Sequence, residues 1–109
     1  MSAQLEDLGR WSDPALLVLS SLAGGEKHGY AMVGDIVEMA GVHLGPGTLY
    51  GALSRLQEQG LIEALPAEGR RRPYRITGAG ARALREQLTT IAAVADTGLG
   101  RLRANGATT

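Results

Sequence analysis

The 109 residues carry 11 basic and 11 acidic side chains, and 44% of them are hydrophobic. This length suffices for one small core and is too short for two comfortable domains. No run approaches the roughly 18 apolar residues of a membrane span, the start lacks a basic and apolar leader, and the absence of cysteine excludes disulfides and thiolate metal sites.

The zero net charge conceals an asymmetry along the chain. Residues 1–40 hold six acidic and two basic side chains, a balance of −4, so residues 41–109 carry +4. Such a difference between the two parts indicates a basic surface suited to nucleic acid. The two histidines, His28 and His43, show no metal-ligand spacing. We therefore expect a cytoplasmic protein without metal, cofactor or membrane partner.

The first 12 residues have a weak amphipathic pattern, with Leu5, Leu8 and Trp11 at three-residue spacing. In one interpretation Trp11 packs against another helix, of its own chain or of a partner. In the other, Trp11 is a plate against which a flat apolar effector stacks.

A first helix is expected from Ala15 to Ala23, after an N-cap at Asp13 and a proline in the first turn. Because this segment is apolar on all sides, it should be buried. In a chain this small, one of its faces is expected to meet a second subunit. We assign Leu16 and Leu19 to that interface.

A second helix is expected to open around Glu26 and to end at Gly41. In a helix-turn-helix unit this helix crosses the DNA backbone, and the hydroxyl of Tyr30 would donate to a phosphate. His28 is expected to satisfy a local hydrogen bond, because no partner stands at catalytic spacing. The apolar stripe comprises Val33, Ile36, Val37 and Ala40.

A third helix is expected between Pro46 and Gly60, with one apolar stripe and an opposite face of little bulk. That face fits the major groove of DNA, where hydroxyls and backbone N–H groups reach phosphates and longer side chains reach base edges. An amphipathic core helix with a solvated back shows the same pattern, and this alternative stays open. The stripe is Leu49, Ala52, Leu53 and Leu56, and the groove-facing residues are Gly47, Thr48, Tyr50, Gly51, Ser54 and Arg55.

Two short strands, at residues 61–66 and 73–76, flank an arginine-rich turn and predict a hairpin. Three consecutive arginines at the tip of a hairpin would grip a phosphate backbone or a minor groove, although a solvated loop is the alternative. Pro73 is expected on an edge strand. Residues 42–44 are expected to pair with the hairpin. The arginines are Arg70, Arg71 and Arg72.

The last helix is expected to start near Ala79, behind an N-cap at Thr77. Its apolar residues keep a 4-3-4 spacing that is typical of a helix-helix seam. The rest of the chain offers too little surface to cover this stripe, so we predict a homodimer. The seam comprises Leu84, Leu88, Ile91 and Ala95, followed by Leu99 or Leu102.

These elements divide the chain into a winged helix-turn-helix unit with an N-terminal helix at residues 1–78, a dimerisation helix at 79–102 and a disordered tail at 103–109. Two glycines near the end of the last helix each cost about 1 kcal/mol relative to alanine. Fraying is therefore expected beyond Asp96 or Leu99. The fold class is mainly α with a small β-hairpin.

The motifs in these elements resemble those of the PadR family of transcriptional regulators, over residues 16–84. The resemblance implies a winged helix-turn-helix repressor that binds a pseudo-palindromic operator as a homodimer and dimerises through a short C-terminus. It also implies release by a small-molecule effector. At Gly51 the chain departs from the family, whose members often carry a bulky or basic residue there. The matching residues are His28-Gly29-Tyr30, Gly47-Thr48-Leu49-Tyr50, Leu53, Leu56, Gly60-Leu61-Ile62, Gly69-Arg70 and Tyr74-Arg75-Ile76-Thr77.

Two functions remain open from the sequence. The first is a DNA-binding regulator; the alternative is a winged-helix module whose small-residue face and arginine tip bind an acidic protein. No nucleophile, metal site or phosphate-cradling loop forms a spaced constellation, so the chain is not expected to be an enzyme.

Overall fold

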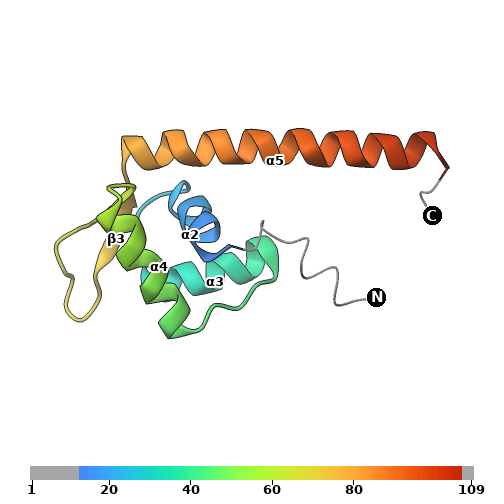
Figure 1. The fold of residues 1–109 in the computed structure, drawn as a ribbon. Helices are drawn as coiled ribbons and strands as arrows, with labels where there is room; N and C mark the ends of the chain where they lie inside the picture. The colour runs from blue at the N-terminus through green and yellow to red at the C-terminus, as the bar shows by residue number, and fades with distance from the viewer. Residues whose placement is uncertain (1–12, 107–109) are drawn as a thin grey trace.

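The structure is a computed structural model and describes residues 13–106. This part contains four helices and three short strands, which confirms the mainly α fold class. Figure 1 shows α5 as a long rod beside the other three helices, with its C-terminal half extending past them. None of the helices in this range combines the length and apolar character needed to cross a bilayer. The elements are α2 (Pro14–Leu22), β1 (Lys27–His28), α3 (Gly29–Ala40), α4 (Pro46–Glu58), β2 (Ile62–Ala64), β3 (Pro73–Ile76) and α5 (Gly78–Ala104).

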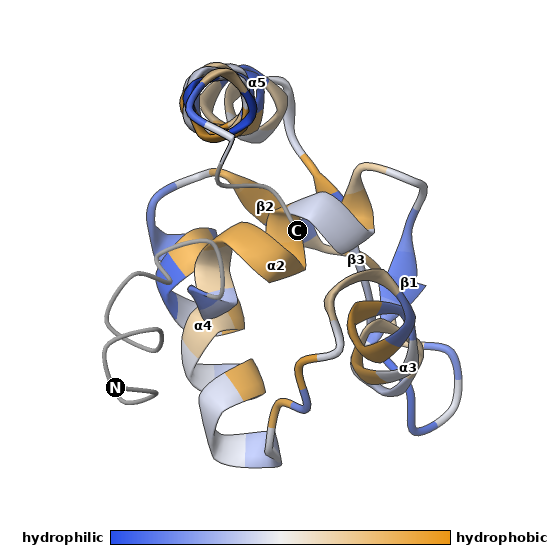
Figure 2. Ribbon diagram, turned by 90° about the vertical axis from the view of Figure 1, so that its right-hand side faces the viewer, coloured by the Kyte–Doolittle hydropathy of each residue, from blue (hydrophilic) through white to orange (hydrophobic). Residues whose placement is uncertain are grey.

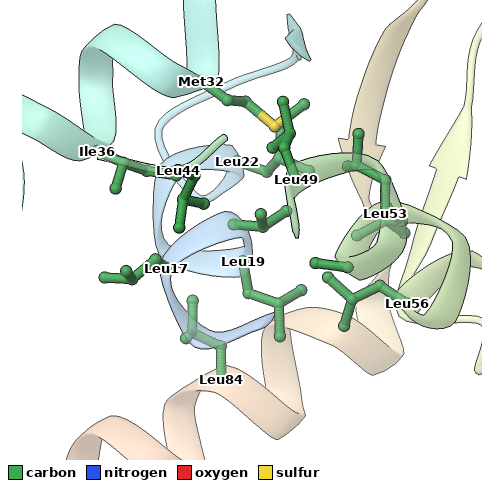
Figure 3. Packing of buried hydrophobic residues seen from close by; sticks show 13 residues of the cluster. Leu17, Leu19, Leu22, Met32, Ile36, Leu44, Leu49, Leu53, Leu56 and Leu84 are labelled. Carbon is green, nitrogen blue, oxygen red and sulfur yellow. The ribbon is translucent and has the colours of Figure 1, made fainter. Parts of the chain in front are cut away.

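Helix α2 forms the centre of the hydrophobic core. It begins where the sequence predicts, because the Asp13 carboxylate accepts a hydrogen bond from the Ala15 N–H at 2.8 Å and Pro14 occupies the first turn. Val18 and Leu22 are fully buried. Figure 3 shows residues of α3, α4 and α5 converging on this helix. The expectation that α2 is buried on most sides is confirmed.

Helix α3 differs from the prediction in its start and its buried face. It begins at Gly29, because the residues before it pair with a strand, and it ends at Ala40, followed by the cap residue Gly41, whose φ of 69° suits glycine. Met32 and Ile36 are buried, whereas Val37 is 36% exposed. Of the predicted stripe, Ile36 is buried and Val33 and Ala40 pack against the core, which confirms these three; Val37 was assigned wrongly, and Met32 was missed.

Helix α4 confirms the predicted stripe: Leu49, Ala52, Leu53 and Leu56 are all buried. Gly60, just past its end, has a φ of 74°, a conformation that side chains other than glycine rarely adopt. The chain turns there into β2.

The sheet has the antiparallel order β1-β3-β2. The predicted hairpin is present as β2 and β3, with Ile62 opposite Ile76. Two expectations were wrong: that residues 42–44 pair with the hairpin, and that Pro73 lies on an edge strand. The third strand is β1, in which His28 pairs with Pro73, and residues 42–44 form no strand. Pro73 consequently lies on the central strand, where it is tolerated because it is the first residue of that strand.

Helix α5 starts as predicted behind Thr77, whose hydroxyl accepts from the Gly80 N–H at 3.0 Å and donates to the Gly60 carbonyl at 2.7 Å. It continues without a break to Ala104, so the expected fraying beyond Asp96 is wrong. Residues 103 and 104, which were expected to begin a disordered tail, are part of this helix.

Candidate nucleic-acid interface

One face of α4 is open to solvent, as the sequence predicts. Thr48, Tyr50, Ser54 and Arg55 are exposed, and the Tyr50 side chain keeps 51% of its surface accessible. Gly47 and Gly51 lie on this face, and a Cβ atom at either would meet nothing within 4 Å. The first two turns of α4 therefore offer hydroxyls and one aromatic ring over a backbone that another surface can approach closely.

Tyr50 leans across toward the start of α3. A Cβ atom added at Gly29 would lie 2.8 Å from the Tyr50 hydroxyl oxygen. The ring borders a hollow of about 400 Å³ between the beginnings of α3 and α4, whose other wall includes Tyr30, with 81% of its surface exposed. The structure thus brings together two tyrosines that the sequence analysis placed separately at the DNA.

The turn between β2 and β3 carries three exposed arginines that differ in their contacts. Arg72 donates to the Leu65 carbonyl oxygen at 2.9 Å and braces the turn. Arg71 approaches His28 with 3.3 Å between Nη1 and Nε2. Arg70 makes no side-chain hydrogen bond to residues 13–106. Of the three predicted DNA-contacting arginines, Arg72 is therefore held within the protomer by a hydrogen bond, whereas Arg71 only lies close to a histidine side chain.

The arginine turn and the start of α4 lie on the same side of the molecule. In Figure 1 both lie on the side away from α5, the turn as a loop reaching outward beside β3. Figure 2, a view nearly along α5, also shows α5 on one side and the start of α4 on the opposite side. The two elements that the sequence assigned to DNA thus face the same side of the molecule.

His28 has the local role expected from the sequence. Its Nδ1 accepts a hydrogen bond from the Ala31 N–H at 3.4 Å and so caps α3. Among residues 13–106, no group of three or more His, Asp or Glu side chains is arranged to hold a metal ion.

A groove of about 760 Å³ lies between α2, the end of α4 and α5. Five of the six residues predicted for dimerisation line it, but their burial is uneven. Leu19 and Leu84 are 6% and 5% exposed within the protomer and belong to its core, so the expectation that the stripe lacks a partner within one chain is wrong for Leu84. Leu88 lies outside the groove and is 42% exposed. The five lining residues are Leu16, Leu19, Leu84, Ile91 and Ala95.

Further along α5, exposed leucines continue the predicted seam. Leu99 and Leu102 keep 53% and 50% of their surface accessible, and Val94, which the sequence analysis omitted, keeps 67%. The apolar spacing that predicted the seam could have included Val94, three residues after Ile91. Trp11, the predicted effector contact, lies outside the described residues.

Comparisons with known proteins agree with this geometry. Residues 18–86 match the model of the transcriptional regulator PadR-like family. A crystal structure of a PadR family transcriptional regulator from Eggerthella lenta is 34% identical, with a TM-score of 0.73 over 93% of this chain and 89% of that one. A transcriptional regulator from Clostridium thermocellum is 26% identical, with a TM-score of 0.68 over 76% of this chain and 86% of that one.

A curated relative is an uncharacterized 37.1 kDa protein in transposon TN4556 of Streptomyces fradiae. It is 43% identical over 83 residues, which are 76% of this chain and 24% of the relative. The chain therefore spans about a quarter of the length of that relative.

Proposed function

The chain belongs to the PadR-like family of transcriptional regulators, and from this premise we propose that it is a repressor that binds a pseudo-palindromic operator as a homodimer. The family is one of transcriptional regulators, not of enzymes. The observation that carries the proposal is the exposed, small-residue face of α4 beside an arginine turn on the same side of the molecule.

In this proposal the start of α4 enters the major groove. Tyr50, Ser54 and Arg55 reach base edges, while Thr48 reaches a phosphate. The open space over Gly47 and Gly51 supports a close approach of the helix backbone to the duplex. Tyr30 at the start of α3 stands free to donate its hydroxyl to the flanking phosphate.

The turn between β2 and β3 is the wing and contacts the backbone or the minor groove beside the same half-site. Arg70 and Arg71 supply the phosphate contacts. Arg72 contributes chiefly by bracing the turn, since its guanidinium donates to the Leu65 carbonyl. This division refines the expectation that all three arginines act on DNA.

Dimerisation through α5 would set the distance between two recognition helices, which must match half-sites about 34 Å apart. The length of α5 beyond the protomer core and its exposed leucines support this part of the proposal. Residues 1–78 then act as the DNA-binding unit and α5 as the dimerisation unit. A small-molecule effector would release the operator by changing the separation, and Trp11 is the proposed contact.

A gel shift on the DNA immediately upstream of the chain's own gene tests the proposal. We expect retardation that weakens steeply as salt rises, because phosphate contacts release counterions. A scrambled duplex of the same length is the matched control and should bind more weakly. If neither duplex is retarded at low salt, the alternative, a winged-helix module that binds an acidic protein, becomes the better interpretation.

A further inference from the structure

His28 contacts two elements at once. Its Nδ1 accepts the capping hydrogen bond from the Ala31 N–H at 3.4 Å, while its Nε2 lies 3.3 Å from Nη1 of Arg71 in the wing. The ring is only partly buried. The edge of the imidazole that does not cap the helix is therefore open beside the arginine.

The chemistry of these groups restricts what the second contact can be. A neutral imidazole has one acceptor nitrogen, and a guanidinium has only donors. Because the Ala31 N–H can only donate, the cap requires that Nδ1 carry no hydrogen, so Nε2 carries it. His28 and Arg71 then face each other as two donors. In this tautomer they form no hydrogen bond with one another, and with 3.3 Å between Nη1 and Nε2 both are near enough to donate to a single acceptor placed beside them.

Within residues 13–106 no side chain supplies that acceptor. The ion pair seen in this range joins Arg75 to Glu63, at 2.7 Å. Glu68, across the turn, meets Arg71 through backbone atoms. The pair of donors therefore points to an acceptor from another molecule, preferably an anionic oxygen because Arg71 is charged.

We propose that the Nε2–H of His28 and the guanidinium of Arg71 together bind one phosphate of the DNA backbone. This inference rests on the proposed DNA-binding function. Arg71 supplies the positive charge, while His28 supplies a donor whose direction is fixed by the cap on α3. His28 then links the phosphate contact of the wing to helix α3, because the same ring caps the start of that helix.

The test replaces His28 with serine. Serine is a favoured N-cap and keeps the start of α3, but it is too short to reach the wing. His28→Ser should weaken binding to operator and scrambled duplex alike, by roughly three- to tenfold, the worth of one hydrogen bond. The slope of affinity against salt should stay unchanged, since the lost donor carries no charge. Arg71→Ala should instead lower that slope by about one.

The decisive measurement is His28→Ser in the Arg71→Ala background. If His28 itself donates to the phosphate, the loss of affinity persists there. If affinity in that background is unchanged, His28 acts only through Arg71 and the proposal is wrong, while DNA binding by the wild-type chain still stands. If the wild-type chain binds no duplex at low salt, both this inference and the proposed function are wrong.

Two further variants secure the comparison. Arg85→Ala removes an exposed arginine from α5, away from the wing, and should leave the wild-type affinity for both duplexes. His28→Ala removes the cap together with the ring. It should match His28→Ser in DNA affinity but melt at a lower temperature, which separates the loss of the donor from any loss of fold.

Discussion

Gly29 is the residue through which α3 meets the proposed base-reading side chain of α4. A Cβ atom there would lie 2.8 Å from the hydroxyl oxygen of Tyr50, at the flexible end of that side chain. Gly29→Ala should therefore push the Tyr50 ring aside and leave the core intact. We expect operator affinity to fall by roughly 1 to 3 kcal/mol, the worth of one base contact, with little change for scrambled duplex or in the salt slope.

The control for this prediction is Gly34→Ala in the same helix, where an added Cβ would meet nothing within 4 Å. It should leave both affinities as they are. Adding Gly29→Ala to a Tyr50→Ala variant should have no further effect, since the displaced ring is already gone. Equal losses for operator and scrambled duplex would show that Gly29 does not act through base recognition.

At the scale of elements, the sequence predicted what local signals determine. The start of α2 at Asp13 and the stripe of α4 follow from capping residues and apolar spacing, and the structure confirms both. The two-residue strand β1 has no pattern of its own and forms only because β3 lies beside it, so it was missed. Its presence also moved the start of α3 to Gly29. Pairing between distant segments therefore accounts for the errors in the sheet.

Helix α5 illustrates a different kind of error. A cost of about 1 kcal/mol for each glycine was expected to end the helix, yet it runs through Gly98 and Gly100 to Ala104. The neighbouring alanine, leucine and arginine residues are strong helix formers.

At the candidate DNA-binding site, the local sequence pattern predicted which residues of α4 are exposed. The approach of Arg71 to His28 depends on tertiary placement and left no signal in the sequence.

Alanine substitutions at two glycines of α5 should change the free energy of unfolding in opposite directions. Gly80 is buried where α5 starts, and a Cβ there would overlap the Leu61 carbonyl oxygen and press on Ile76. Gly80→Ala should therefore destabilise the fold by about 1 to 3 kcal/mol, as overpacking does. Gly98 has open space around it, so Gly98→Ala should stabilise the helix by about 1 kcal/mol. Urea unfolding at one fixed protein concentration measures both, and a stabilised Gly80→Ala variant would contradict this account of the junction.

At the scale of the whole molecule, α5 determines the shape. The described part extends over 55 × 28 × 20 Å, and Figure 1 shows that the far half of α5 accounts for much of its length. Leu99 and Leu102 lie in that half and are half exposed. Exposed apolar residues on a projecting helix are what an interface between two copies would cover. Point changes far along α5 test the dimer better than truncation of the helix, because removing all of α5 after Arg82 would take Leu84 out of the protomer core as well.

Leu99→Glu should separate the dimer without unfolding the protomer. A carboxylate at this position is harmless in water but would be desolvated between two α5 helices, so the dimer dissociation constant should rise by at least about tenfold. Operator affinity should fall with it, because each half-site would then be bound independently. Thr97→Glu adds the same charge on the opposite face of α5 and should leave the dimer intact. Sedimentation equilibrium over a range of concentrations distinguishes the two variants. A wild-type chain that stays monomeric, or a Leu99→Glu dimer as tight as wild type, would place the subunit contact elsewhere than on this half of α5.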